Sequence, residues 1–370
     1  MKKKLLLYSL LCFVLGIPAK GIAQSREFHV IGYYAGRTIP PDSFQVEQLS
    51  HLIWCFGHLK GNRLHIATEK DSIIIKQMVA LKKRNPKLKV LLSLGGWGGC
   101  EPCSDVFSSK QGRDEFAKSA RELCDYFGTD GIDLDWEYPV VKGHPGHPYK
   151  EADRGNFTEL VKALRSQLKT DAVISFAAGG FTAYIDSSID WKAVMPMVDF
   201  VNVMSYDLVH GYSTISGHHT PLYSTKQQTE STDHAVKMMI RKGVEPSKIV
   251  IGAAFYGRYF EMTESGETGL YRPCRFKHAF SSKYASDSLS TTNGFEVFWD
   301  DEAQAPYAIN KERRLLATYD DKKSVALKTA YAWKQNLGGI MFWQLYDDSF
   351  KGGLLETISN TLLKTKEGWK

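Results

Sequence analysis

Short apolar runs recur eight times along the chain, and this recurrence constrains the possible folds more than any other feature of the sequence. The runs are rich in Val and Ile and end in Gly or in polar residues, which is typical of strands buried on both faces of a parallel sheet. The predicted strands are His29–Gly36, His51–Leu59, Lys89–Trp97, Gly131–Pro139, Val173–Gly180, Phe200–Leu208, Ile249–Arg258 and Gly339–Tyr346.

Helical periodicity fills most of the intervals between these predicted strands. Apolar residues recur there every three or four positions, and Pro86 ends the first helical interval. The predicted helices are 71–85, 111–127, a segment capped by Asn156 that carries Leu160, Leu164 and Leu168, and 321–337. Alternation of this kind predicts an α/β protein. A closed (β/α)8 TIM barrel accounts for eight strand–helix units better than an open sheet does.

One interval is too long for an ordinary connection within a barrel. Roughly 60 residues separate Arg258 from the last predicted helix, and polar and turn residues are enriched among them. A structureless loop of that length is uncommon in a compact domain. We therefore expect a small α+β insertion at 261–320, between the seventh and eighth strands, which interrupts a barrel spanning 24–370 and lies over one wall of its site.

The N-terminus has the three parts of a secretory signal peptide. Lysines at 2–4 precede the apolar run Leu5–Ile17, and small residues at 21–23 allow cleavage after Ala23. The apolar run is shorter than the about 20 residues that cross a bilayer. We therefore expect residues 1–23 to be removed, no membrane span to remain and the protein to be secreted to the periplasm or the medium. Lipid anchoring at Cys12 is disfavoured because the bulky Leu11 precedes it.

The net charge gives no support to a nucleic-acid partner. Removal of residues 1–23 takes away four lysines and no acidic residue, so the formal charge falls from +6 to +2. The remaining chain has no run of five or more like charges. Proteins that bind nucleic acids concentrate basic residues on one face. The sequence pI of 8.8 is therefore no argument for a nucleic-acid partner.

The cysteines favour a local disulfide and give no support to a metal site. Five remain after the expected cleavage, and an odd number in an exported protein leaves at least one free thiol. Cys100 and Cys103 are close enough for a disulfide, but a zinc site would need a second matching pair. Cys55 and Cys124 lie in apolar runs and are expected in the core. The segment His144–Pro148 holds two histidines, but its Pro and Gly residues favour a loop, and we expect no metal or cofactor.

Three acidic residues alternate along one predicted strand. Residues two apart share a face, with roughly 6–7 Å between their side chains. Asp133, Asp135 and Glu137 therefore point into the barrel, with Glu137 nearest its mouth. Unpaired buried carboxylates cost several kcal/mol, and like charges this close share protons and raise at least one pKa. Glu137 is thus a candidate general acid, a group that cleavage of a glycosidic bond requires.

The acidic strand resembles the signature of a known family. Asp130-x-x-Asp133-x-Asp135-x-Glu137 is similar to the motif of family 18 glycoside hydrolases, the chitinase family. Further similarities follow the family's order, at Ser93-Leu94-Gly95-Gly96, Met204-Ser205-Tyr206-Asp207 and Trp343 in the barrel, and at Trp299-Asp300-Asp301, Pro306-Tyr307 and Thr318-Tyr319-Asp320-Asp321 in the expected insertion. The resemblance covers essentially the whole chain after residue 23 and implies a barrel with a chitinase insertion domain.

The resemblance implies a role for each acidic residue. In this family the N-acetyl carbonyl of the sugar attacks the anomeric carbon, so hydrolysis is substrate-assisted and proceeds with retention through an oxazolinium ion. By this resemblance, Glu137 protonates the leaving oxygen and later activates water. Asp135 is expected to orient the acetamido N–H and to stabilise the cation. Asp133 is expected to share a proton with Asp135, held from below by Ser93 and Tyr33.

The resemblance also implies sugar contacts at the ends of the strands. Tyr206 is expected to hydrogen-bond the acetamido carbonyl, Trp343 to form the floor of the central sugar site, and Trp97 to stack on the leaving-group side. The other expected sugar contacts are Tyr33, Phe56, Gly96, Met204, Asp207, Tyr256 and Arg258.

Three functions stay open at this point. The first is a secreted chitinase that hydrolyses β-1,4 bonds between N-acetylglucosamine units. The second is an endo-β-N-acetylglucosaminidase acting on N-glycans or a related bacterial polymer, although Trp136 and Tyr138-Pro139 look more like those of chitinases. The third is a chitin-binding lectin on the same barrel, but lectin members typically lack the acid that Glu137 supplies here. The expected partner is chitin or an N-acetylglucosamine-containing oligosaccharide, bound by a monomer.

Overall fold

The protein is described by a computed structural model that covers residues 27–36, 38–264 and 269–366. The expected signal peptide at 1–23, with Cys12, lies outside the described residues. Within the described ranges, no helix combines the length and the apolar character that a bilayer crossing needs.

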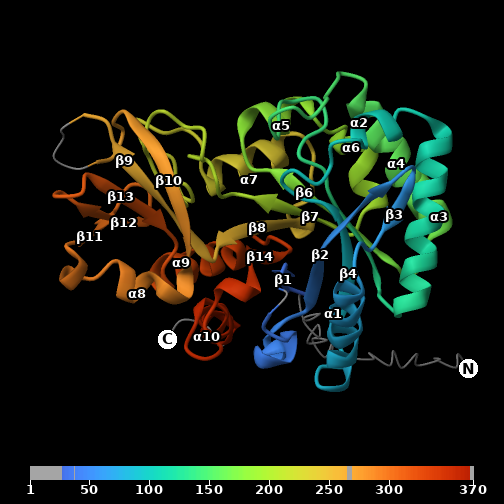
Figure 1. Ribbon diagram of the computed structural model, residues 1–370, viewed down its shortest axis with the longest axis horizontal. Helices are drawn as coiled ribbons and strands as arrows, with labels where there is room; N and C mark the ends of the chain where they lie inside the picture. The colour runs from blue at the N-terminus through green and yellow to red at the C-terminus, as the bar shows by residue number, and fades with distance from the viewer. Residues whose placement is uncertain (1–26, 37, 265–268, 367–370) are drawn as a thin grey trace, which may run out of the picture.

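Eight parallel strands close into a barrel, which confirms the predicted (β/α)8 fold (Figure 1). Each strand pairs with its neighbour in the chain, and β1 pairs with both β14 and β2 to complete the circle. The barrel strands are β1 His29–Tyr34, β2 His51–Lys60, β4 Lys89–Gly95, β5 Gly131–Asp135, β6 Val173–Gly179, β7 Phe200–Met204, β8 Ile249–Ala254 and β14 Gly339–Trp343. A short strand, β3 Arg63–His65, extends the end of β2 as an antiparallel hairpin.

The barrel strands begin at the residues that the sequence predicts, but most of them end earlier. Strand β4 stops at Gly95 instead of Trp97, β5 at Asp135 instead of Pro139, and β7 at Met204 instead of Leu208. The apolar residues just beyond these ends prolong the sequence pattern although they belong to loops. As a result, Trp97, Glu137 and Asp207 lie in the loops above the strands, at the end of a barrel where active sites form.

Helices surround the barrel and bury its outer face. They are α1 Glu69–Ala80, α2 Cys103–Val106, α3 Lys110–Phe127, α4 Asp153–Gln167, α5 Thr182–Ser187, α6 Trp191–Val194, α7 Thr232–Arg241, α9 Lys322–Lys334 and α10 Leu354–Lys366. The 3-10 helices η1 Pro41–Ser43 and η2 Val46–Gln48 take the place of an α-helix between β1 and β2.

The prediction that Asn156 caps a helix is wrong. The prediction that the last helix begins at Asp321 holds, with Asp321 as its N-cap. Helix α4 starts three residues before Asn156, which lies in its first turn and donates a hydrogen bond to Asp153 Oδ1 (3.2 Å). The helix starts early because the buried Asp153 carboxylate accepts hydrogen bonds from the Lys150 backbone and from Ser104 Oγ. Asp321 caps α9 in a reciprocal capping box with Ser324.

A second, antiparallel sheet lies between β8 and α9 in the sequence and beside the barrel in space (Figure 1). Its order is β10-β9-β13-β12-β11. The strands are β9 Tyr256–Met262, β10 Cys274–Ser281, β11 Glu296–Asp300, β12 Ala305–Asn310 and β13 Leu315–Tyr319, and the short helix α8 Ala285–Ser288 packs at one edge. Hereafter we call this segment, from β9 to β13, the insertion sheet.

The single strand predicted at Ile249–Arg258 is wrong in its second half. The structure divides it into β8 and β9 at Phe255, and β9 pairs with β10 and β13 of the insertion sheet. Tyr256 and Arg258 therefore belong to the insertion sheet and reach the barrel from the side.

The core has an outer and an inner part. The outer part fills the space between strands and helices, and the inner part lies within the barrel, where Ile31, Ile53 and Leu91 are fully buried. Cys55 and Cys124 are buried free thiols, as is Cys274, while Cys100 and Cys103 form a disulfide. The expectations of a local disulfide and of two core cysteines are thus confirmed.

Candidate active site

Asp133 lies deepest in the acidic stack and is fully buried. The register of the barrel sets Ser93 of β4 and Ser175 of β6 beside it. Its Oδ2 accepts hydrogen bonds from Ser93 Oγ (2.8 Å) and Tyr33 Oη (3.1 Å). Its Oδ1 accepts from Ser175 Oγ (2.6 Å) and Asn202 Nδ2 (3.4 Å). Burial outweighs these neutral donors, so the pKa of Asp133 is raised.

Asp135 and Glu137 continue the stack toward the mouth of the barrel. Asp135 ends β5, whereas Glu137 stands two residues beyond the strand and is still only 8% exposed. Burial, together with the charges of Glu137 and Asp133, holds the pKa of Asp135 well above its ordinary value. Burial also raises the pKa of Glu137 to about 7, against a hydrogen bond from Tyr138 and with a further contribution from the charge of Asp207. A carboxyl group with this pKa can give and take a proton near neutral pH.

One oxygen of Asp135 is an unmet acceptor. Among the described residues, nothing donates a hydrogen bond to its buried Oδ1. Leaving a buried acceptor unpaired costs about 1–3 kcal/mol. The backbones of Gly95 and Asp135 pack tightly together. A Cβ at Gly95, whose φ is +105°, would lie 2.2 Å from the Asp135 carbonyl oxygen. A hydrogen-bond donor that reached Asp135 Oδ1 would remove this cost.

Asp207 is the centre of a different kind of cluster. Its carboxylate accepts hydrogen bonds from Tyr256 Oη (2.7 Å) and from two nitrogens of Arg258, and His219 Nδ1 lies 3.5 Å away. Burial opposes its charge, but hydrogen bonds from His219 and Arg258 and the charge of Arg258 lower the pKa of Asp207 well below its ordinary value. Its φ of +55° is uncommon for a residue other than glycine but is tolerated by Asp.

Tyr206 lies between the acidic stack and this cluster. It is buried, its hydroxyl contacts Met341 Sδ at 3.7 Å, and its ring meets the Tyr256 ring edge-on at 6.0 Å. Burial, followed by the charges of Asp135 and Asp207, raises the pKa of the Tyr206 hydroxyl well above its ordinary value, so the hydroxyl keeps its proton as a donor. Met204, which ends β7, packs against the same interior cluster.

Trp343 and Phe56 form an aromatic floor. Their rings stack at 5.6 Å with an interplanar angle of 12°, and the Tyr33 ring lies 6.0 Å from Trp343. Gly96 makes this floor possible because a Cβ at that position would meet the Phe56 ring at 2.3 Å. Its φ of +75° also favours glycine.

Trp97 belongs to an aromatic rim above the floor. It is 49% exposed, and its ring lies 5.4 Å from His144, 6.5 Å from Tyr138 and 6.2 Å from Tyr212. Tyr212 comes from the loop after β7 and is itself exposed. Three loops, after β4, β5 and β7, thus bring aromatic rings together at the mouth.

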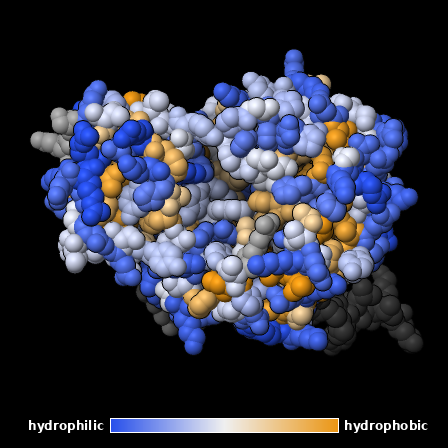
Figure 2. All heavy atoms as spheres, in the orientation of Figure 1, coloured by the Kyte–Doolittle hydropathy of each residue, from blue (hydrophilic) through white to orange (hydrophobic). Residues whose placement is uncertain are grey.

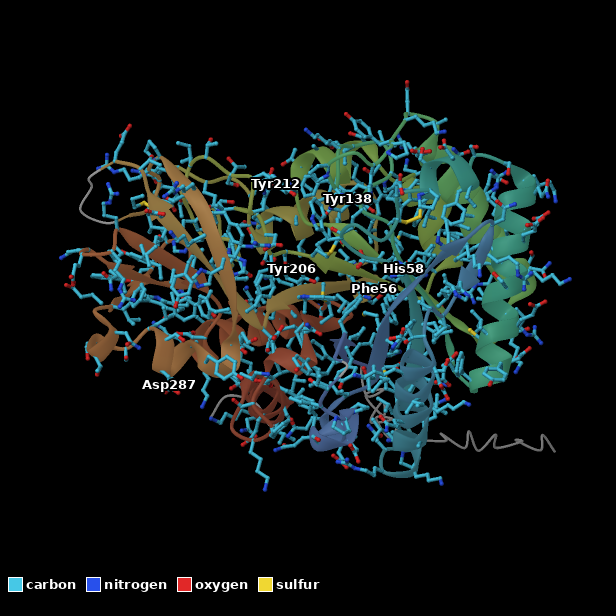
Figure 3. All side chains as sticks on the ribbon, viewed as in Figure 1. Phe56, His58, Tyr138, Tyr206, Tyr212 and Asp287 are labelled. Carbon is cyan, nitrogen blue, oxygen red and sulfur yellow. A yellow bond between two sulfur atoms is a disulfide. The ribbon has the colours of Figure 1, made fainter. Side chains whose placement is uncertain are left out.

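The views of the side chains and the surface agree with this arrangement. Figure 3 shows Phe56 and Tyr138 over the barrel, Tyr206 and Tyr212 on the side of the barrel nearer the insertion sheet, and Asp287 far from all four at the edge of the insertion. Figure 2 shows a hollow between the two lobes whose walls are paler than the hydrophilic outer surface.

The structure brings together all the site residues that the sequence predicts, and it adds residues that sequence reasoning missed. Ser175, Asn202, Tyr138 and Tyr212 are the additions. Ser175 and Asn202 carried a signal, because each is a polar residue inside an apolar strand that neighbours the barrel interior. Tyr138 and Tyr212 lie in loops, whose path the sequence pattern does not define.

His144 and His147 lie side by side, with ring centroids 4.6 Å apart. Among the described residues, no three His, Cys, Asp or Glu side chains come close enough together to hold a metal ion.

Comparison with known proteins identifies the family. Residues 29–348 match the model of glycosyl hydrolases family 18. A chitinase A1 from Niallia circulans is 31% identical over 78% of this chain, which spans 44% of that protein's length. A chitotriosidase-1 from Mus musculus is 28% identical over 85% of this chain and 70% of its own. A solved family 18 N-acetylglucosaminidase from Paenibacillus barengoltzii has 32% identity and a TM-score of 0.82, and the match covers 90% of this chain and all of that one.

The family match covers most of the chain and includes the segment that carries Asp133, Asp135 and Glu137. The resemblance that the sequence motifs indicate is thereby confirmed. The chain belongs to family 18 of the glycosyl hydrolases.

Proposed function

We propose that the protein is a chitinase that hydrolyses β-1,4 bonds between N-acetylglucosamine units with retention of configuration. The observation that carries this proposal is the stack of Asp133, Asp135 and Glu137, in which Glu137 at the mouth has a pKa of about 7 and is able to donate a proton. The chain spans less than half of the Niallia circulans relative, so the proposal concerns the activity of this domain.

In the first step Glu137 protonates the glycosidic oxygen as the bond from that oxygen to the anomeric carbon breaks. The carbonyl oxygen of the neighbouring acetamido group forms the new bond to the anomeric carbon, which gives a cyclic oxazolinium ion. In the second step the Glu137 carboxylate takes a proton from water, the water oxygen bonds to the anomeric carbon, and the acetamido group is restored. Two displacements at one carbon give net retention.

The unmet acceptor of Asp135 supports its part in this reaction. Its buried Oδ1 lacks a donor among the described residues, and the acetamido N–H of a bound sugar is a donor of the required kind. A negative charge here also stabilises the positive oxazolinium ion. Asp133, held by neutral donors alone, shares a proton with Asp135 as that charge develops.

The surrounding residues suit a sugar in this position. Trp343, stacked on Phe56, offers a flat apolar face to a pyranose ring. The Tyr206 hydroxyl keeps its proton and is available as a donor to the acetamido carbonyl. Asp207 and Arg258 supply charged hydrogen-bonding groups beside it, and Trp97 stacks on the sugar on the leaving-group side.

A second candidate is the release of single N-acetylglucosamine units. It is favoured by the similarity to the Paenibacillus barengoltzii protein, which is named an N-acetylglucosaminidase and which this chain covers completely. An endo-β-N-acetylglucosaminidase acting on N-glycans would use the same acidic stack. A lectin would not need the proton donor that Glu137 provides.

We propose secretion from the lysine and apolar pattern of residues 1–23 alone. N-terminal sequencing of the protein from culture medium and periplasm tests it. A mature chain starting at Gln24 is the expected result.

The test of activity is product analysis by mass spectrometry. The protein and its Glu137→Gln variant are incubated with chitohexaose and, in parallel, with an N-glycoprotein. Chitobiose or chitotriose formed only by the unmodified protein supports the chitinase. N-acetylglucosamine as the first product supports the second candidate. Intact chitohexaose beside a glycoprotein trimmed to one N-acetylglucosamine would overturn both.

A further inference from the structure

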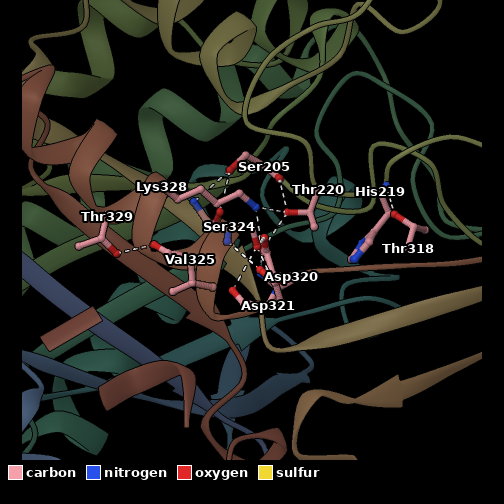
Figure 4. A network of polar contacts seen from close by, with 12 residues as sticks. Ser205, His219, Thr220, Thr318, Asp320, Asp321, Ser324, Val325, Lys328 and Thr329 are labelled. Carbon is pink, nitrogen blue, oxygen red and sulfur yellow. Dashed lines mark hydrogen bonds and ion pairs between the residues drawn. The ribbon is translucent and has the colours of Figure 1, made fainter. Parts of the chain in front are cut away.

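A buried ion pair joins the insertion sheet to the barrel, some distance from the acidic stack. Lys328 of α9 and Asp320, which follows β13, are both almost completely buried. Lys328 Nζ donates to Asp320 Oδ2 (2.6 Å) and to Thr220 Oγ1 (2.5 Å). Figure 4 shows this network, in which Lys328 and Asp320 lie at the centre of the dashed contacts.

Asp320 holds the two points at which the chain crosses between the barrel and the insertion sheet. The chain leaves the barrel after Ala254, and it returns from β13 at Asp320. Asp320 Oδ2 accepts a hydrogen bond from the Ala254 backbone N–H (2.9 Å), and its Oδ1 accepts from Ser324 Oγ in α9 (2.6 Å). One carboxylate therefore ties the outgoing strand, the returning strand and the next helix together.

The same network extends to the loop that carries Tyr206 and Asp207. Thr220 Oγ1 donates to the backbone carbonyl of Ser205, the residue before Tyr206 (3.2 Å). The backbone of His219, next to Thr220, makes two further bonds. Its carbonyl accepts from the Leu208 N–H, and its N–H donates to Thr318 Oγ1 of β13 (3.0 Å). The pair and the site are thus connected through two hydrogen bonds and one peptide unit.

The energetics of such a pair argue against stability as its main use. Transfer of two charges from water to a protein interior costs several kcal/mol for each ion, and well-packed apolar residues in their place are often neutral or stabilising. An ion pair instead restricts geometry, because its donors and acceptors have to face one another. Here that requirement favours one arrangement of the three segments that the pair joins. At this junction the arrangement decides how β9, with Tyr256 and Arg258, faces Asp207.

We propose that Lys328 and Asp320 are positioning residues that fix the orientation of the insertion sheet relative to the barrel, and so set the geometry of Tyr206 and of the contact between Arg258 and Asp207. The proposal rests on the proposed function for its effect on catalysis, but its structural part stands without it. Neither residue touches the acidic stack in the structure, and both act through Thr220 and Ala254.

The experiment measures orientation directly. Nitroxide labels are attached at Ile73→Cys on α1 and Val297→Cys on β11, both exposed positions, and the distance between them is measured by double electron–electron resonance. The native free thiols are buried, and protein without the two added cysteines gives the background. The matched control is Asp153→Asn, which removes the charge of another fully buried carboxylate, one that accepts a hydrogen bond from Ser104 within the barrel domain.

Lys328→Met is expected to shift or broaden the distance distribution, whereas Asp153→Asn is expected to leave it unchanged. On chitohexaose, kcat/KM of Lys328→Met is expected to fall by about 10- to 100-fold more than that of the control, since small displacements of positioned groups are costly. If Lys328→Met fails to fold, the charge-neutral double variant Lys328→Met/Asp320→Asn takes its place. An unchanged distance distribution in the folded variant overturns the proposal.

The two proposals fail in different ways. If the unmodified protein does not hydrolyse chitohexaose, the proposed function falls, and the distance measurement still decides whether Lys328 orients the insertion sheet. If the unmodified protein is active, and Lys328→Met has the same distances and the same rates as the control Asp153→Asn, only the positioning role is wrong.

Discussion

Two neighbouring groups of carboxyl side chains have pKa values that are shifted in opposite directions. Asp133, Asp135 and Glu137 have raised pKa values, whereas the pKa of Asp207 is lowered. The Asp207 side chain is 36% exposed, yet partial burial still opposes its charge, so burial does not account for its lowered pKa. The difference lies in the partners, because the stack meets hydroxyl, amide and carboxyl groups and Asp207 meets the guanidinium of Arg258.

The comparison shows how one fold prepares both a proton donor and a fixed negative charge. The barrel interior supplies neutral donors from neighbouring strands, and the insertion sheet supplies the cation from β9. An opposite charge in contact stabilises the ionised form, while like charges and burial favour the neutral form. The insertion sheet therefore has an electrostatic effect as well as a structural one, since its Arg258 keeps Asp207 ionised.

The largest effect is expected from removal of the proton donor. Glu137→Gln keeps the shape of the side chain but cannot donate or accept the catalytic proton, so kcat on chitohexaose is expected to fall by about 100- to 10,000-fold. Oligosaccharide binding, measured by calorimetry, should persist. The exposed Glu151→Gln in the following loop serves as the control. Near-normal turnover by Glu137→Gln would remove Glu137 from its role.

A smaller loss is expected at the residue between the two groups. Tyr206→Phe deletes the hydroxyl that we propose as a donor to the acetamido carbonyl, and loss of one such pre-organised donor costs about 100-fold in kcat. Tyr126→Phe, at an exposed position on α3, is the matched control. The assay is again initial-rate hydrolysis of chitohexaose. A variant as active as the control would mean that another group holds the carbonyl.

Removal of the charge of Asp207 is expected to move the pH profile. Asp207 raises the pKa of Glu137, so Asp207→Asn lowers it, and the uncompensated Arg258 acts in the same direction. The general acid must be protonated, so the alkaline limb of kcat/KM, near pH 7 in the unmodified protein, moves to lower pH. Above the limb the rate falls roughly tenfold for each unit of displacement. The exposed Asp105→Asn should leave the limb in place, and a shift to higher pH for Asp207→Asn would contradict the comparison.

The smallest effect is expected at the rim, outside both groups. Trp97→Ala removes one stacking face for the sugar, and an aromatic contact of this kind contributes about 0.5–1.5 kcal/mol, or about 2- to 10-fold in KM. The pH profile should not change. Phe350→Ala is the control. Phe350 is equally exposed, but its ring contacts Phe44 and none of the rings around Trp97 among the described residues. A large fall in kcat would show that Trp97 shapes the acidic stack.

The barrel was predictable from the sequence because its strands are continuous apolar runs with clear starting points. The acidic stack was predictable for the same reason, since alternation on β5 sets Asp133 and Asp135 on one face. The ends of the strands were not predictable. Aromatic and apolar residues such as Trp97 and Leu208 extend the pattern into loops where they serve the site or its surroundings.

The residues that sequence reasoning missed depend on pairing between distant segments. Ser175 and Asn202 become partners of Asp133 only through the neighbouring strands β6 and β7, and Tyr212 meets Trp97 across two loops. The division of the predicted strand at Phe255 has the same cause, because β9 takes its partners, β10 and β13, from residues far along the chain.

The most direct test of the account is a titration of Glu137 itself. Carbon-13 NMR spectra of protein labelled at the glutamate side-chain carboxyl carbon are recorded across pH 4–9, and the spectra of Glu137→Gln identify the resonance by its absence. We expect a midpoint near pH 7 for Glu137 in the unmodified protein. A midpoint at the ordinary value of 4.5 would leave Glu137 ionised at neutral pH and would contradict its assignment as the proton donor.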